Sequence, residues 1–118
     1  MKSTSNNFND ETFELKLNCW IVGDDYNKIN HAKILSSEFV ADLQNLIKML
    51  ASNRLSEVDG KKLSLWPGNF NPLNLKEEAE GLKNRNPLYP LANLGDVFGS
   101  GTDSSKVNVI IRVPGEYP

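Results

Sequence analysis

Residues 12–22 are Thr-Phe-Glu-Leu-Lys-Leu-Asn-Cys-Trp-Ile-Val, and they alternate almost perfectly between two sets of side chains. A period of two is typical of a β-strand that presents one face to a core. One face carries Phe13, Leu15, Leu17, Cys19 and Ile21, and the other carries Glu14, Lys16, Asn18, Trp20 and Val22. The segment therefore predicts a first strand whose odd-numbered residues are buried.

A turn, a second strand and a helix are predicted next. Residues 23–27 have the composition of a turn, and residues 31–35 predict a short strand that pairs with the first, with Ala32 and Ile34 inward. Ser36 and Ser37 suit a helix N-cap, and helical periodicity continues to about residue 53. The apolar stripe of this helix consists of Phe39, Val40, Leu43, Leu46, Ile47 and Leu50. Such a helix must bury one face, and the inner face of the sheet is its expected partner.

The second half of the chain predicts two more strands. Residues 61–66 favour a third strand with Leu63 and Leu65 inward, which Pro67 and Gly68 should end. Residues 69–86 favour a long, charged surface excursion, with a helical turn over residues 76–80 as the alternative that Gly81 argues against. Residues 87–98 favour a short helix because Leu91, Leu94 and Phe98 recur at helical spacing. The last strand is predicted over residues 106–113, with these residues inward: Val107, Val109, Ile111 and Val113.

This order of elements favours an α+β fold of the β-grasp, or ubiquitin-like, type. In that fold a mixed four- to five-stranded sheet packs on one amphipathic helix, with the last strand parallel to the first at the centre. A ferredoxin-like fold is the alternative, but it needs a second full-length amphipathic helix, which residues 69–98 do not provide. We expect residues 1–11 to be a flexible leader, residues 12–114 to be the domain, and residues 115–118 to begin a linker.

The composition argues against several classes of function. A chain of 118 residues fits one domain. Its net charge of −2 and scattered lysines and arginines argue against a nucleic-acid-binding surface, which needs a concentrated basic face. Cys19 and His31 are the only residues of their kinds, so the chain has too few ligands for a cysteine zinc site and almost nothing for a catalytic triad. We therefore expect no metal and no cofactor.

A catalytic role has little support. Asp24 and Asp25 are potential metal ligands, but they lie in a predicted turn, where aspartate is common for conformational reasons. The potential acids and bases in the polar segment that follows the third strand have no supporting partner group; they are Glu77, Glu78 and Glu80. Residues 99–102 lack the lysine and the following helix of a phosphate-binding loop. We expect a protein that is not an enzyme.

No stretch of the sequence resembles a secretory signal or a membrane span. Acceptor sites for N-glycosylation are also absent. We therefore expect the protein either to function in a reducing cytosol or to leave the cell by a route for which its sequence carries no recognisable signal.

Several motifs, in their order and spacing, are similar to the N-terminal header domain of Crinkler proteins in its fungal form. The similarity covers about residues 12–114 and includes the first strand ending in Gly23-Asp24-Asp25 and the spacing of Val40, Leu43 and Ile47. Its signature residues are Leu63, Leu65, Trp66, Pro87, Leu88, Pro90, Leu91, Leu94 and Phe98. Two features depart from the family. The Leu-Phe-Leu-Ala-Lys translocation motif of oomycete members is replaced by residues 63–68, and Pro67 follows the tryptophan where fungal members often carry lysine.

The resemblance implies a non-catalytic, ubiquitin-like N-terminal domain of a modular effector. Such a domain would be secreted without a recognisable signal peptide, enter a host cell and in some cases its nucleus, and mediate delivery, protein–protein interaction or both. A variable C-terminal region would carry the effector activity. The alternative is a cytosolic ubiquitin-like scaffold that binds a protein partner or itself, with no transport role.

Four apolar residues are predicted on the sheet face that points away from the helix: Trp20, Val22, Trp66 and Ile110. Because β-grasp order makes the first, last and third strands neighbours, these residues would meet in an exposed apolar patch that marks a protein-interaction face. The alternative is that residues 69–98 fold over this face and use Trp66 as an anchor. The short second strand is expected at a sheet edge, where a homodimer can form, although Lys33 favours a monomer.

Overall fold

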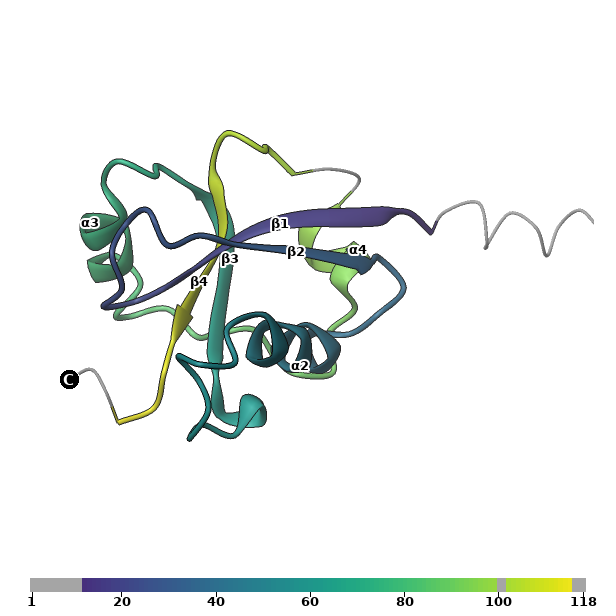
Figure 1. Cartoon of the computed structure of the whole chain (residues 1–118). Helices are drawn as coiled ribbons and strands as arrows, with labels where there is room; N and C mark the ends of the chain where they lie inside the picture. The colour runs from purple at the N-terminus through teal and green to yellow at the C-terminus, as the bar shows by residue number, and fades with distance from the viewer. Residues whose placement is uncertain (1–11, 100–101, 116–118) are drawn as a thin grey trace, which may run out of the picture.

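The computed structural model describes residues 12–99 and 102–115. The predicted leader and most of the predicted linker lie outside the described residues, as do Ser100 and Gly101 of the loop before the last strand. The elements in chain order are β1 (Glu14–Ile21), β2 (Asn30–Leu35), α2 (Val40–Leu50), the short 3₁₀ turn η1 (Gly60–Lys62), β3 (Ser64–Phe70), α3 (Leu75–Glu80), α4 (Leu94–Phe98) and β4 (Val107–Arg112) (Figure 1).

The four strands form one mixed sheet in the order β2-β1-β4-β3. β1 pairs antiparallel with β2 and parallel with β4, and β4 pairs antiparallel with β3. The last strand thus lies beside the first in the middle of the sheet, as predicted. The α+β class with a mixed sheet and one main helix is confirmed, and the arrangement is compatible with a β-grasp.

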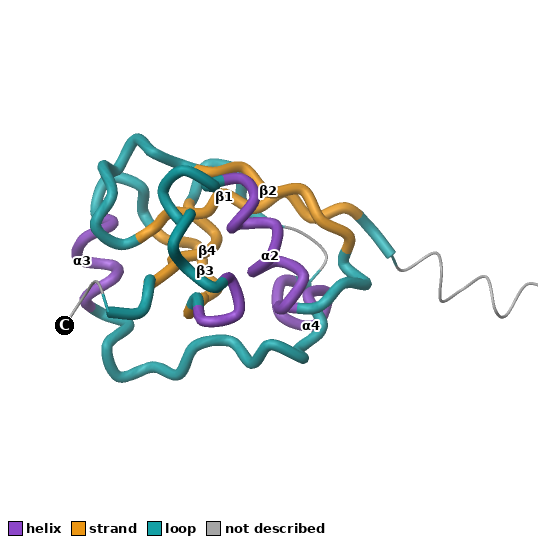
Figure 2. The backbone as a smooth tube through the Cα atoms, turned by 60° about the horizontal axis from the view of Figure 1, so that its bottom comes forward, coloured by secondary structure: helices purple, strands orange, loops and turns teal. Residues whose placement is uncertain are grey.

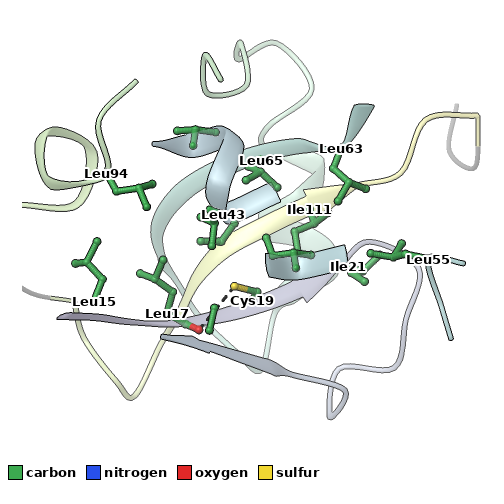
Figure 3. Packing of buried hydrophobic residues seen from close by; sticks show 14 of the residues in the cluster. Leu15, Leu17, Cys19, Ile21, Leu43, Leu55, Leu63, Leu65, Leu94 and Ile111 are labelled. Carbon is green, nitrogen blue, oxygen red and sulfur yellow. Dashed lines mark hydrogen bonds between the residues drawn. The ribbon is translucent and has the colours of Figure 1, made fainter. Parts of the chain in front are cut away.

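One face of the sheet, here called the inner face, packs against α2 and α4, while α3 lies on the opposite side (Figure 2). The odd-numbered residues of β1 point into this inner cluster, as the alternation predicts, and meet Leu43 of α2 (Figure 3). Two members of the predicted apolar stripe are less buried than expected, because Phe39 and Leu50 are 46% and 44% exposed. The inner cluster also holds Ala32, Val40, Ile47, Leu55, Leu63, Leu65, Leu94, Val109, Ile111 and Val113.

Helix α2 begins later than Ser36 and Ser37 suggest. Its N-cap is Phe39, whose backbone N–H donates to the carboxylate of Asp42 at 2.9 Å. The side chain of Ser36 does not cap the helix. Its hydroxyl oxygen accepts a hydrogen bond from the backbone N–H of Phe13 at 2.9 Å. The predicted serine cap is therefore wrong, and Ser36 ties the start of the first strand to the end of the second.

The first N–H groups of α2 find partners far along the chain. Val40 N–H donates to the carbonyl of Ala92, and Ala41 N–H donates to the carbonyl of Pro90, both at 2.9 Å. Helix N-termini leave such donors without intrahelical acceptors. Carbonyl groups of the proline-rich segment before α4 therefore accept the hydrogen bonds that the first turn of α2 cannot form within the helix. This gives that part of the signature a structural role.

Strand β3 differs from its prediction at both ends. Residues 60–62 form η1, and the strand continues through Pro67 and Gly68 to Phe70 instead of ending at Trp66. Proline is tolerated because β3 is an edge strand, where one row of N–H groups has no strand partner. The register with β4 shifts between Pro67 and Phe70, as at a β-bulge.

Strand β4 is irregular at the same place. Val107 was predicted to point inward, but it packs on the other side of the sheet in the cluster of Phe70. The neighbouring Asn108 is fully buried, and its carboxamide accepts from the N–H of Asn18 at 2.8 Å and donates to the carbonyl of Asp103 at 3.1 Å. This side chain replaces backbone pairing between β1 and the start of β4.

Candidate functional site

The outer face of the sheet brings the predicted interaction residues together. Trp20 of β1 is in register with Ile110 of β4, and Ile110 is in register with Trp66 of β3. Val22, which follows β1, donates its N–H to the carbonyl of Ile111 at 2.8 Å and belongs to the same cluster. The expected position of all four side chains on one face is therefore observed.

The exposure predicted for these residues is wrong. Trp20 and Trp66 are each 5% exposed, Val22 is 7% exposed, and Ile110 is fully buried. Helix α3 and the segment after it cover the face, so residues 69–86 are not the solvated excursion that their charges suggested. This outer cluster is completed by Phe70, Leu75, Ala79, Leu82 and Val107.

Both indoles are fixed by polar contacts as well as by packing. Trp20 Nε1 donates to the carbonyl of Asp25 at 3.1 Å, and Trp66 Nε1 donates to the carbonyl of Arg85 at 3.0 Å. A buried indole N–H generally requires such a partner. The guanidinium carbon of Arg112 lies 5.5 Å from the centroid of the Trp66 ring, within the range of a cation–π contact. Trp66 thus anchors the segment that covers the outer face.

The surface is hollowed where α3 meets the turn between β1 and β2, and this region is here called the rim. Two adjoining pockets of about 230 and 320 Å³ share Trp20, Asp24 and Lys76 in their linings. Tyr26 and Leu73 line the larger pocket and are 67% and 82% exposed. The rim therefore offers apolar contact area close to the buried tryptophans.

The acidic residues considered for catalysis have structural partners. Asp24 accepts from Nε of Arg54 at 2.7 Å. Glu78 accepts from the N–H of Asn71 at 2.8 Å, and Glu80 forms an ion pair with Lys83 at 2.9 Å. Asp25 and Glu77 are exposed. Across residues 12–99 and 102–115, no three histidine, cysteine, aspartate or glutamate side chains gather as metal ligands.

The single histidine and the single cysteine have ordinary surroundings. His31 is exposed on β2, with Nδ1 2.7 Å from Oδ1 of Asn18. Cys19 is buried in the inner cluster, and this burial raises the pKa of its thiol from 9.0 to about 12. None of the helices in the described part of the chain has both the length and the apolar character needed to cross a bilayer.

We expect Cys19 to resist maleimide at neutral pH in the folded protein and to react after unfolding in urea, as measured by mass spectrometry. The thiolate is the reactive form, and burial disfavours it. Because the folded pKa exceeds the unfolded pKa, the stabilising effect of the protonated thiol is complete below pH 9 and is lost as the pH rises towards 12. Labelling of the folded protein at the rate of an unstructured cysteine peptide would contradict this placement.

The signature residues divide between core and surface. Leu88 N–H donates to the carbonyl of Leu65 at 2.8 Å, which fixes the proline-rich segment to β3. Four signature residues are buried (Leu63, Leu65, Trp66 and Leu94), two are half-buried (Leu88 and Phe98), and three are exposed (Pro87, Pro90 and Leu91). Most of the signature therefore supports the fold.

The comparison with known families agrees with this arrangement. The family model of the Crinkler effector protein N-terminal domain matches residues 15–112, which include almost all of β1 and the whole of α2, β3 and β4. The chain belongs to the Crinkler effector family. No curated protein matched it. The Crinkler N-terminal domain is an effector header domain and is not a known catalytic domain.

The cover of the outer face agrees with the alternative prediction, in which the segment after the third strand folds over it with Trp66 as an anchor, but the residues that make the contact had only a weak signal. Leu75, Ala79 and Leu82 are spaced by four and three residues, which is the spacing of one helix face. The signal is short, and Gly81 interrupts it. Tyr26 and Leu73 stand outside any periodic segment, so the rim pocket had no sequence signal at all.

Proposed function

We propose that this Crinkler domain is a non-catalytic module of a secreted, host-directed effector. Its role is to deliver the sequence attached to it into a host cell, to bind a protein partner there, or both, with the nucleus as one destination. The observation that carries the proposal is the family match over residues 15–112.

The surface chemistry supports a role in recognition. Among the described residues, three of the candidate acidic groups form hydrogen bonds or ion pairs, and the others are exposed without a supporting base or nucleophile. The surface instead offers the exposed side chains of Tyr26 and Leu73 at the rim and a strand edge at β2 with no strand beside it in the sheet order. Both features are typical of surfaces that contact polypeptides.

A reporter fused after residue 118 tests the delivery part of the proposal. We expect secretion of the fusion and uptake by host cells, measured by fractionation and by reporter activity inside the host. The control is the same reporter without the Crinkler domain. Retention of both proteins in the producing cell would leave the alternative, a ubiquitin-like scaffold with no transport role.

Self-association is the second candidate, and the position of β2 at the end of the sheet order favours it. An uncovered strand edge can pair with a second copy of itself. Sedimentation at high protein concentration separates the two cases. A single species of 13.2 kDa excludes the homodimer.

A further inference from the structure

Strand β2 presents unpaired backbone groups along its outer edge. Ser36 N–H donates to the carbonyl of Phe13 at 2.8 Å, which fixes that pair as a hydrogen-bonded one. Hydrogen-bonded pairs alternate along an antiparallel ladder, so even-numbered residues of β2 bond to β1, and His31, Lys33 and Leu35 direct their backbone groups outward. Only the Leu35 carbonyl of these has a backbone partner within the described chain, the N–H of Glu38. The edge is open over its central residues.

The opposite edge of the sheet, at β3, is less accessible to an added strand than the edge of β2. The carbonyl of Leu65 in β3 accepts from the N–H of Leu88, so the proline-rich segment occupies that edge. Pro67 lacks a donor, and the register shift between Pro67 and Phe70 bends the strand. A partner strand that adds to this sheet therefore has β2 as its natural place.

Two lysines lie side by side next to the open edge. Lys16 of β1 is directly opposite Lys33 of β2, both side chains are exposed, and neither has an ion-pair partner among residues 12–99 and 102–115. By the alternation above they form a non-hydrogen-bonded pair, in which side chains are closest. Like charges in this position destabilise a sheet. An acidic side chain on an added strand would relieve the repulsion.

A hollow continues from one end of this edge. It has a volume of about 280 Å³ and lies between the start of β2 and the end of α2. Ile29, Leu50 and Ala51 are its apolar lining, and the other six lining residues are polar or charged, including the ion-paired Asp24 and Arg54. Leu50 is 44% exposed there, and Lys28 stands at the same pocket. Its position on the α2 side of the sheet suits the apolar side chains of a strand whose acidic side chains point to the lysine side.

We propose that the edge of β2 binds an extended segment of a partner protein in which acidic and apolar residues alternate. The segment adds a strand to the sheet through the backbone groups of His31 and Lys33. Its acidic side chains lie beside Lys33, with Lys16 one strand further into the sheet, and its apolar side chains face α2 and the apolar residues of the hollow at Leu50. This inference deepens the protein-recognition part of the proposed function, on which it rests, and does not depend on delivery.

A second copy of this chain fits the edge less well than such a segment. β2 contains Lys33 and His31 but no acidic residue. Antiparallel pairing of two β2 strands about Lys33 places the two lysines opposite each other, beside Lys16 of each copy. Pairing with a second copy would therefore increase the like-charge repulsion, whereas an acidic segment would remove it.

The test is a titration of the ¹⁵N-labelled 118-residue chain with the peptide Glu-Val-Asp-Ile-Glu-Val-Asp, followed by NMR. We expect the largest shift changes at His31, Lys33 and Leu35. K33E should weaken binding about tenfold, since it replaces an opposite-charge neighbour by a like charge. The same variant should raise the midpoint of thermal unfolding, because it converts the repulsive pair with Lys16 into an attractive one.

Two further variants test whether the peptide binds specifically at the edge of β2. K62E changes an exposed lysine just before β3, at the opposite edge of the sheet, and should leave both peptide binding and the unfolding midpoint nearly unchanged. K33P removes an outward N–H and should abolish binding. If K33P fails to fold, the difference in peptide binding between K33E and K62E still tests the proposal.

The inference is overturned by absence of peptide binding, by shift changes centred at the Tyr26 and Leu73 rim, or by equal binding of the peptide Lys-Val-Lys-Ile-Lys-Val-Lys. It is also overturned if the free protein sediments as a dimer that an excess of the peptide does not convert to monomer, since the edge would then belong to a second copy. Peptide binding without host uptake of the reporter refutes delivery alone. Uptake without peptide binding refutes only the site inferred here.

Discussion

Replacing Trp66 by alanine is expected to lower the free energy of unfolding by about 3–5 kcal/mol. The change removes an indole that is 5% exposed, its hydrogen bond to the carbonyl of Arg85 and its contact with Arg112. It also leaves α3 without its main anchor on β3. Small domains have only about 5–15 kcal/mol in total, so the variant should be largely unfolded at moderate urea.

Urea unfolding followed by circular dichroism measures this loss, and Trp20 remains as the fluorescent reporter of the outer cluster. Y89A is the matched control, because Tyr89 is an aromatic residue that is 67% exposed. Its effect should stay within about 0.5 kcal/mol. A loss below about 1 kcal/mol for W66A would mean that the outer cluster is not a core but a loose cover, since core truncations of aromatic residues cost more.

Replacing Leu43 by alanine is expected to cost about 2–5 kcal/mol, since Leu43 is fully buried where α2 meets the sheet. M49A is the matched control on the same helix, because Met49 is 72% exposed. Its cost should be a few tenths of a kcal/mol, about the range of surface substitutions. Equal losses for the two variants would contradict the orientation of α2.

The two clusters should unfold together in all these variants. Val109 and Ile111 of β4 point into the inner cluster, and Ile110 between them points into the outer one. Loss of β4 pairing therefore removes packing on both faces at once. We expect fluorescence and circular dichroism to give coincident transitions, which is the usual test of two-state unfolding.

The faces of the strand residues were predictable, except at Val107, because alternation depends only on local sequence. It placed Trp20, Ile110 and Trp66 on one side, and the structure confirms their register. Their burial was not predictable in the same way. It depends on Leu75 and Ala79, which follow β3 in a helix of six residues whose period is too short to be distinctive.

The error at the end of β3 has a different cause. Proline ends a strand only where its missing N–H is needed, and Pro67 lies on an edge strand, a fact that requires the order of the whole sheet. The pairing of Lys16 with Lys33 likewise requires the hairpin register, which no single strand determines. The edge position of β2 was therefore predictable, but the charge of the surface inferred there became visible only once the strands were paired.

The parallel contact between β1 and β4 sets how the domain resists a pulling force. Cys19, Trp20 and Ile21 pair with Val109, Ile110 and Ile111 in the same direction. If the two ends of the chain are pulled apart, the start of β1 and the end of β4 move in opposite directions along this contact. The hydrogen bonds between them are then loaded together in shear and cannot open one after another. A narrow passage that draws the domain in by either end would meet its greatest resistance at these six residues.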